Sequence, residues 1–153
     1  MNFNNTSRPL LEIQHLNLSY QGSPVLVDIN LTVHPHQITA IVGADGAGKT
    51  ILLRVLSGLE RKISGKIVFA GEALETRPAW EVVKRGLVYV PEGMRVFPQM
   101  SVLENLEVGA YCHREGMAGR LDLVFRIFPE VRDLVHQPAG RLSGGQQRMV
   151  TLG

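Results

Sequence analysis

A glycine-rich octapeptide lies in the first third of the chain and reads Gly43-Ala44-Asp45-Gly46-Ala47-Gly48-Lys49-Thr50. It matches the pattern G-x-x-x-x-G-K-[ST], in which glycines let the backbone wrap around phosphate groups and the lysine adds a positive charge. The apolar run before it, residues 38–42, predicts a strand covered on both faces, and residues 49–57 predict a helix that ends at Gly58. Strand, loop and helix in this order indicate a phosphate-binding loop, with the Thr50 hydroxyl as a Mg²⁺ ligand.

A second glycine-rich motif lies near the end of the sequence, where Leu142 precedes Ser143-Gly144-Gly145-Gln146. A helix that begins here would direct backbone N–H groups and the positive end of its dipole toward an anion. The two motifs together indicate ATP as the ligand.

The pair of motifs resembles that of the ATP-binding-cassette ATPases, over about residues 10–153. The resemblance implies an α/β P-loop fold with an antiparallel β subdomain, a helical subdomain at about residues 100–141, and a core whose C-terminal part is missing. It also implies that Tyr20 stacks on adenine, a contact that an aromatic face makes with any base. Glu92 lies where the family has its Q-loop, which implies contact with Mg²⁺, the attacking water or a membrane subunit.

One branch of that family shares further stretches with this chain. Val90-Pro91-Glu92-Gly93, the following Val96-Phe97, and residues 101–106 and 128–129 resemble the ATPase subunits of branched-chain amino-acid importers. The resemblance implies that ATP binding and hydrolysis drive solute uptake through separate permease subunits, with this chain on the cytoplasmic face of the cell membrane. Two cassettes, identical or different, would hold each ATP between residues 43–50 of one chain and residues 143–146 of its partner.

Several parts of the family pattern do not occur in these 153 residues, namely the aspartate and catalytic glutamate after a hydrophobic strand and the histidine that senses the γ-phosphate. We therefore expect the N-terminal portion of a cassette, impaired in hydrolysis when alone. One alternative is a fragment that at most binds nucleotide. Another is an ATPase subunit for a different solute, such as urea or a lipid-linked sugar. A chromosome-maintenance or repair ATPase would carry a long coiled-coil insertion between Glu92 and Ser143, and this sequence has none.

Composition narrows the class of protein further. A formal net charge of +2, with no basic run, argues against a nucleic-acid partner. The single cysteine, Cys112, excludes an internal disulfide and suits a reducing cytosol. The polar first eight residues lack a secretory signal, and no segment approaches the roughly 20 apolar residues that cross a bilayer, so transport would need membrane subunits on other chains.

The remaining patterns predict local structure around the two motifs. Residues 16–20 alternate and a turn at residues 21–24 leads to a second alternating strand, whose inward side chains would be Val25, Val27, Ile29, Leu31 and Val33. Residues 66–69 and 87–90 predict further strands. Thr76 is expected to cap a helix that runs through Pro78 to Arg85 and closes at Gly86, with Trp80 in the core.

Beyond residue 100 the pattern becomes helical. Ser101 and Glu104 form a capping box, and one apolar helical face ends at Pro129. That face consists of Leu121, Val124, Phe125 and Phe128. The five histidines show no spacing typical of a zinc site. Asp45 stands where the family usually has asparagine, and its carboxylate would repel the phosphates and weaken affinity.

Overall fold

The computed structural model describes residues 8–61, 63–93, 96–112 and 115–153. Contacts divide the chain into two units, Met1–Tyr89 and Val90–Gly153, each with a hydrophobic core of its own. The predicted helical subdomain at residues 100–141 falls inside the second unit, and its boundaries stay a prediction.

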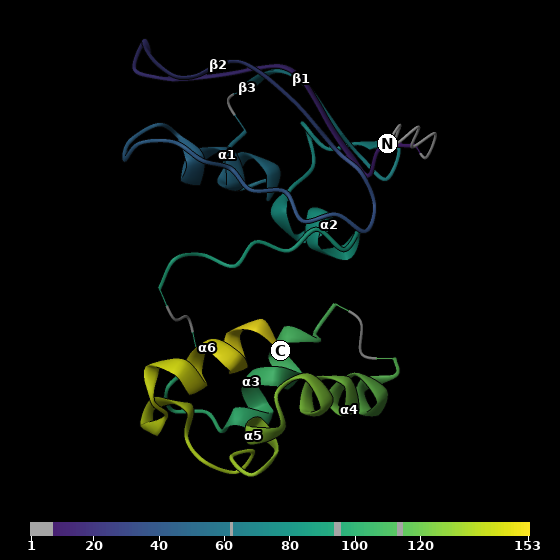
Figure 1. Cartoon of the computed structure of the whole chain (residues 1–153), viewed down its shortest axis with the longest axis vertical. Coiled ribbons are helices and arrows are strands. Elements are labelled where there is room, and N and C mark those ends of the chain that lie inside the picture. The colour runs from purple at the N-terminus through teal and green to yellow at the C-terminus, as the bar shows by residue number, and fades with distance from the viewer. Residues whose placement is uncertain (1–7, 62, 94–95, 113–114) are drawn as a thin grey trace, which may run out of the picture. The chain divides into compact units, whose positions relative to one another are not determined.

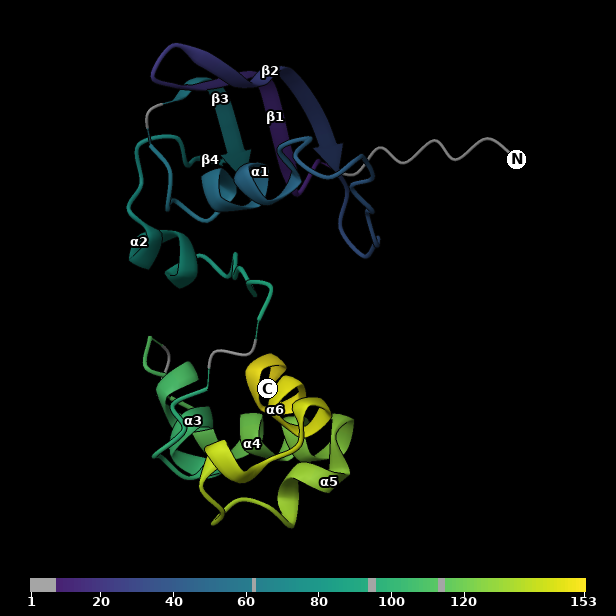
Figure 2. The same ribbon diagram turned by 90° about the vertical axis from the view of Figure 1, so that its left-hand side faces the viewer.

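An antiparallel sheet in the order β2-β1-β3-β4 forms the frame of the first unit (Figure 1). Its strands are β1 (Leu11–Tyr20), β2 (Ser23–Val33), β3 (Ile63–Phe69) and β4 (Glu72–Ala73). Helix α1 (Lys49–Leu56) lies against one face of this sheet (Figure 2). The predicted antiparallel region is confirmed, and the β3 strand is longer than residues 66–69.

The hairpin between β1 and β2 turns in two residues. Gln21 and Gly22 both have positive φ, 49° and 84°, as the tight turns that match the twist of paired strands require. Ser23 and Pro24, which were expected in the turn, already belong to β2.

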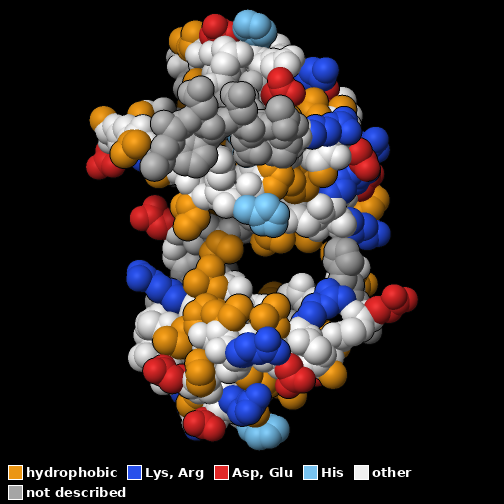
Figure 3. Space-filling model, turned by 45° about the vertical axis from the view of Figure 1, so that its right-hand side comes forward, with side chains coloured by type: hydrophobic (Ala, Val, Ile, Leu, Met, Phe, Trp, Pro, Cys, Tyr) orange, Lys and Arg blue, Asp and Glu red, His pale blue; other side chains and the backbone are white. Residues whose placement is uncertain are grey.

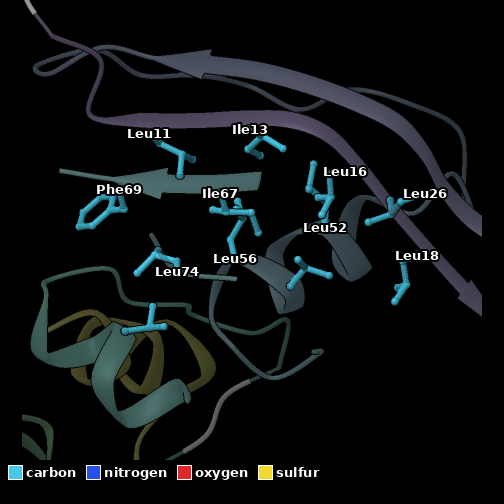
Figure 4. Close-up of a cluster of buried hydrophobic side chains, with 12 residues drawn as sticks. Leu11, Ile13, Leu16, Leu18, Leu26, Leu52, Leu56, Ile67, Phe69 and Leu74 are labelled. Atoms are coloured by element: carbon cyan, nitrogen blue, oxygen red, sulfur yellow. The ribbon is translucent and has the colours of Figure 1, made fainter. Parts of the chain in front are cut away.

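Bulges change which side chains of β1 and β2 face the core. On β1, Leu11 and Ile13 are buried, and after one extra residue at His15 the buried positions are Leu16 and Leu18 (Figure 4). On β2 the alternation shifts near Asp28, so that Leu26 is buried. The prediction that Val27 faces inward was therefore wrong, because a bulge reverses the alternation and leaves this side chain 64% exposed.

Gly65 of β3 lies next to the β1 bulge. Its φ is +101°, and a Cβ at this position would overlap the backbone carbonyl oxygen of His15. The bulge therefore requires glycine on the neighbouring strand, both for its conformation and for the close approach of the two backbones.

Two predicted strands do not form among the described residues. Residues 38–42 are not in a strand, and Ile38 and Val42 are 103% and 92% exposed instead of covered on both faces. Residues 87–90 are also without strand pairing, and Val88 is 65% exposed. The apolar, β-branched composition is right for strands, but a strand forms only on a hydrogen-bonding neighbour, and no described segment pairs with either run.

Helix α2 (Ala79–Lys84) is shorter than predicted and starts differently. Pro78 is its N-cap, and no side chain caps it, so the assignment of Thr76 as the cap was wrong. Pro78 has an extended backbone and no side-chain oxygen, so α2 begins there without a capping acceptor. Trp80, predicted for the core, is 57% exposed with the Lys84 ammonium 5.0 Å from its ring centroid, because Val82 occupies the buried position.

The second unit is helical within its described residues. It contains α3 (Val102–Gly109), α4 (Met117–Ile127), α5 (Pro129–Arg132), the 3₁₀ turn η1 (Ala139–Arg141) and α6 (Gly144–Leu152). The predicted capping box at α3 is confirmed: the Glu104 N–H donates to Ser101 Oγ at 3.2 Å, and the Ser101 N–H donates to Glu104 Oε2 at 2.7 Å. The apolar face of α4 packs in the core as predicted, and Pro129 begins α5.

The described residues include no helix that is long and apolar enough to cross a membrane. In the same ranges no three His, Cys, Asp or Glu side chains gather as a metal site would require. On the face that Figure 3 shows, blue basic and red acidic side chains are interspersed, without a continuous basic surface in the coloured part.

Candidate phosphate-binding site

The glycine-rich loop of residues 43–48 turns directly into α1. Ala47 N–H donates to Ala44 C=O at 3.1 Å, which closes a turn, and Gly46 inside that turn has φ +80°. Gly48 is the N-cap of α1 with φ +89°, and a Cβ there would come within 3.0 Å of the Leu26 side chain. Glycine at position 48 therefore meets two requirements, a left-handed backbone and close packing on β2.

The start of α1 has no capping side chain. Its first internal hydrogen bond runs from Leu52 N–H to Gly48 C=O, at 2.8 Å. Within the described ranges, the N–H groups of residues 48–51 have no acceptor. A helix N-terminus with unpaired N–H groups and no capping carboxylate is an anion-binding site, because the helix dipole adds positive charge there.

Lys49 places its ammonium at the loop itself. Its Nζ donates to the carbonyl oxygens of Gly43 and Ala44, at 2.7 Å each. The side chain is half-buried, so its position is set by the loop. These bonds hold a positive charge beside the open N–H groups, where an incoming phosphate can compete for it as a charge-assisted acceptor.

Two further polar side chains of the loop are exposed, Asp45 and Thr50. Among the described residues neither side chain has a hydrogen-bond or ion-pair partner, so the Thr50 hydroxyl is free to bind a ligand. A hydroxyl oxygen suits Mg²⁺, which binds a few protein oxygens together with phosphate oxygens and water. The donor set therefore fits the ion expected from the sequence.

An apolar cleft of about 310 Å³ borders the loop at Lys49. Aliphatic side chains of β2 and of residues 40–42 form most of its wall. Such a surface suits hydrocarbon, so phosphate would bind at the loop N–H groups and the Lys49 ammonium and not against the aliphatic wall.

Tyr20 is the last residue of β1 and is 42% exposed. Partial burial raises the pKa of its hydroxyl, and a hydrogen bond to the Glu60 carboxylate raises that pKa further. Glu60 in turn accepts from Arg54 of α1, with Nη2 to Oε1 at 2.9 Å. The ring is thus tied to the helix that follows the loop, through two residues that the sequence patterns did not identify.

The second motif begins α6. Ser143 Oγ accepts from the Gln146 N–H at 3.3 Å, and the Gln146 side-chain Oε1 accepts from the Ser143 N–H at 3.0 Å. This reciprocal arrangement is a capping box. In the described part of the chain, the N–H groups of Gly144 and Gly145 have no acceptor, so the helix start keeps two donors for an external oxygen.

Glu92 is exposed in the second unit. It lines a cleft of about 340 Å³ together with Arg148, Thr151 and Leu152 of α6. Tyr20 and residues 43–50 belong to the first unit, and Glu92 and residues 143–146 belong to the second. The predicted site residues thus fall into two sets, one on each unit, and each unit contains one glycine-rich helix start.

The geometry agrees with comparisons to known proteins. The ABC transporter family pattern matches residues 26–153. The chain belongs to the ABC transporter family. It is 33% identical, over 94% of its length, to a high-affinity branched-chain amino acid transport ATP-binding protein of Pseudomonas aeruginosa, and it covers 62% of that protein.

Other relatives are similar at the same level. A probable branched-chain amino acid transport ATP-binding protein of Archaeoglobus fulgidus is 33% identical over 94% of this chain, which covers 61% of that relative. A galactose/methyl galactoside import ATP-binding protein of Salmonella typhimurium is 35% identical over 94% of this chain and 29% of its own length. The chain thus spans less than two thirds of these relatives.

Solved structures confirm the fold. An ATP-binding cassette of an ABC transporter in its ADP conformation superposes with a TM-score of 0.76 at 24% identity, over 95% of this chain and 63% of that one. The ATP-binding subunit of another ABC transporter gives a TM-score of 0.79 at 23% identity, over 94% and 60% of the two chains. The predicted α/β P-loop cassette fold is therefore confirmed.

Proposed function

We propose that this chain is the nucleotide-binding part of an ABC importer ATPase, which binds ATP and Mg²⁺ and drives solute uptake through separate permease subunits. The observation that carries the proposal is the start of α1, where unpaired N–H groups of residues 48–51 lie beside the Lys49 ammonium. Membership of the family and the ATP-binding relatives support ATP as the ligand.

In this proposal each group of the loop has one task. The N–H groups of α1 and the Lys49 ammonium bind the β- and γ-phosphates, and the Thr50 hydroxyl is a ligand of Mg²⁺. Bound Mg²⁺ would neutralise charge on the phosphates. Tyr20 stacks on the adenine, and Glu92 contacts the metal or the attacking water. Because phosphoryl transfer has a loose transition state, these groups contribute by positioning and by offsetting charge.

The second motif acts across a dimer in this proposal. The open N–H groups of Gly144 and Gly145 would meet the γ-phosphate of an ATP bound to the loop of a second cassette. Closure of two cassettes, identical or different, on two ATP molecules would then drive the permease subunits at the cytoplasmic face of the membrane. The capping box of Ser143 and Gln146 holds the helix start at which these donors lie.

Branched-chain amino acids are the solute that the relatives favour. Two relatives that the chain covers over 62% and 61% of their length carry that description. A galactose-type sugar is the second candidate, because the Salmonella typhimurium relative is 35% identical over the matched region. Solute contacts lie on other chains, so the choice needs a transport measurement.

Isothermal titration of the chain with ATP and Mg²⁺ tests the binding step. We expect one site per chain, competition by ADP and inorganic triphosphate, and weaker binding without Mg²⁺. Absence of binding, or binding that triphosphate does not compete for, would contradict the proposal. Uptake of radiolabelled leucine and galactose by cells with and without the gene tests the solute: loss of leucine uptake alone is expected, and loss of galactose uptake alone would assign the sugar.

A further inference from the structure

Two residues in the left-handed backbone region lie on neighbouring strands, His15 of β1 with φ 50° and Asp28 of β2 with φ 47°. The Asn17 side chain bridges them, since its Nδ2 donates to the His15 carbonyl at 2.7 Å and its Oδ1 accepts from the Asp28 N–H at 2.9 Å. Asn30 bridges them in the opposite sense. Its Oδ1 accepts from the His15 N–H at 2.9 Å, and its Nδ2 donates to the Asp28 carbonyl at 2.8 Å.

The Asn17 and Asn30 side-chain amides thus bind the backbone N–H and C=O groups of both His15 and Asp28. The His15 and Asp28 side chains also meet, with Nδ1 and Oδ1 2.7 Å apart. Hydrogen bonds from His15 and then from Asn30 lower the pKa of the Asp28 carboxyl below its ordinary value. We call His15, Asn17, Asp28 and Asn30 the bulge brace. Non-glycine residues keep a left-handed conformation only where their surroundings hold them, and the brace provides that support.

The β1 bulge decides which way Tyr20 points. Leu16 and Leu18 face the core that α1 shares (Figure 4). Tyr20 follows Leu18 at the same two-residue spacing on β1. Its contact with Glu60 agrees with a position on the α1 side. If His15 had an ordinary extended backbone in place of the bulge, the alternation from Leu11 and Ile13 would carry Ser19 to that side and turn Tyr20 away, because a one-residue slip reverses every side chain.

We propose that the bulge brace is a positioning device for nucleotide-base recognition, which sets Tyr20 on the side of the sheet where α1 and its phosphate-binding loop lie. The inference rests on the proposed function and deepens it. It separates two parts of the ligand: the brace acts on the base through Tyr20, whereas the phosphates bind to residues 43–50. Loss of the brace should therefore weaken the binding of ATP and leave the binding of inorganic triphosphate, which has no base, unchanged.

The test compares ATP with inorganic triphosphate, both with Mg²⁺, by isothermal titration of the full chain. The variant is Asn17→Ala/Asn30→Ala, and Thr32→Ala on the exposed side of β2 is the matched control. We expect the double variant to bind ATP about tenfold more weakly, in line with the loss of one base–aromatic stack, and to bind triphosphate within about twofold of the wild type. The Thr32→Ala control binds both ligands as the wild type does.

A second background shows whether the brace acts through Tyr20. In a Tyr20→Ala chain the two asparagine changes are expected to weaken ATP by no more than about twofold further, because the base contact is already lost. If the double variant does not fold, Asn17→Asp replaces it. This change keeps the acceptor for the Asp28 N–H and removes the donor to His15, and it is expected to weaken ATP selectively by a smaller factor.

Equal losses of affinity for ATP and for triphosphate would overturn the positioning role and leave the phosphate site intact. An effect of the two asparagine changes on ATP affinity that is as large in the Tyr20→Ala chain as in the wild type would do the same. If the proposed function is wrong and residues 43–50 do not bind phosphate, Lys49→Ala should leave the affinity for triphosphate unchanged. That outcome removes the phosphate site and with it the role of the brace.

Discussion

Two glycine-rich helix starts in this chain differ in how their backbone donors are used. At α1 no side chain caps the helix, Gly48 is left-handed, and the N–H groups of residues 48–51 are open within the described ranges. At α6 a capping box pairs the N–H groups of Ser143 and Gln146, and within the described residues the N–H groups of Gly144 and Gly145 stay unpaired. The uncapped start is suited to bind an anion within its own chain, whereas the capped start already uses part of its donors and offers a smaller site.

Among the variants of the two helix starts, removal of the Lys49 ammonium should cause the largest loss of ATP affinity. Lys49→Ala should weaken ATP by about 2 kcal/mol or more, roughly thirtyfold, because the ammonium provides a charge-assisted bond to phosphate. Titration with a fluorescent ATP analogue measures the change. The matched control is Lys66→Ala, an exposed side chain of β3, which should bind as the wild type does. Equal affinities of Lys49→Ala and wild type would exclude residues 43–50 as the phosphate site.

Loss of the α6 cap should affect helix stability and spare nucleotide binding by the single chain. Ser143→Ala removes the acceptor of the Gln146 N–H and should destabilise the helix start by about 1 kcal/mol. Hydrogen exchange should then speed up at residues 144–147, with Ser64→Ala on β3 as the control. A large loss of ATP affinity in the dilute single chain would show that residues 143–146 bind the nucleotide of their own chain, contrary to the proposal.

A neutral residue in the loop should strengthen phosphate binding modestly. Asp45 is exposed, so its repulsion of ATP is screened, and Asp45→Asn should gain about 1 kcal/mol or less, a few-fold in affinity. The gain should shrink as salt is added, because salt screens exposed charges. Titrations at low and high ionic strength measure it. A gain that does not depend on salt would show that the amide acts by a hydrogen bond instead of by loss of charge.

The smallest effect should come from the other capping box, at α3. Hydrogen bonds from the Ser101 N–H and then from its hydroxyl lower the pKa of Glu104 below 4.5. A carboxyl with a lowered pKa in the folded state adds stability above its ordinary pKa, and this contribution disappears as the pH falls through the folded pKa. Melting temperatures between pH 6 and pH 3 should therefore fall less in Glu104→Gln than in wild type.

Glu107→Gln on the exposed face of the same helix is the control for that series. It should melt with the same pH dependence as the wild type, since among the described residues Glu107 has no hydrogen-bond partner. Identical pH profiles for Glu104→Gln and wild type would mean that the box does not stabilise α3 in solution.

Local chemistry could be predicted from the sequence wherever one segment contains all the partners. The α3 capping box and the apolar face of α4 each depend on residues within a few positions, and both are confirmed. Helix α1 ends at Leu56, one residue earlier than predicted, with Ser57 as its C-cap and Gly58 left-handed just beyond it. The strands predicted at residues 38–42 and 87–90 do not form, because their partners would have to come from other segments. A strand needs a neighbour, and an apolar run does not show whether one is present.

The bulges were missed because they depend on contacts between strands. Alternation read along β2 placed Val27 inside. Across the strands, the Asn17 and Asn30 side chains accept from the Asp28 and His15 N–H groups and support the extra residue that reverses the pattern. A signal was present in the sequence: His15 and Asp28 each precede an asparagine by two positions, and His and Asp are among the residue types that tolerate a left-handed backbone. The Glu60 contact of Tyr20 had no such signal.

Backbone amide mapping tests the central claim most directly, that the uncapped start of α1 binds the phosphates of a nucleotide. Nuclear magnetic resonance of the ¹⁵N-labelled chain, titrated with ATP and Mg²⁺ and then with inorganic triphosphate, follows each N–H separately. The account predicts that both ligands cause the largest shifts at residues 46–50, while the amides of residues 144–147 move little in the dilute single chain. Unchanged amides at residues 46–50 under saturating ATP would contradict it.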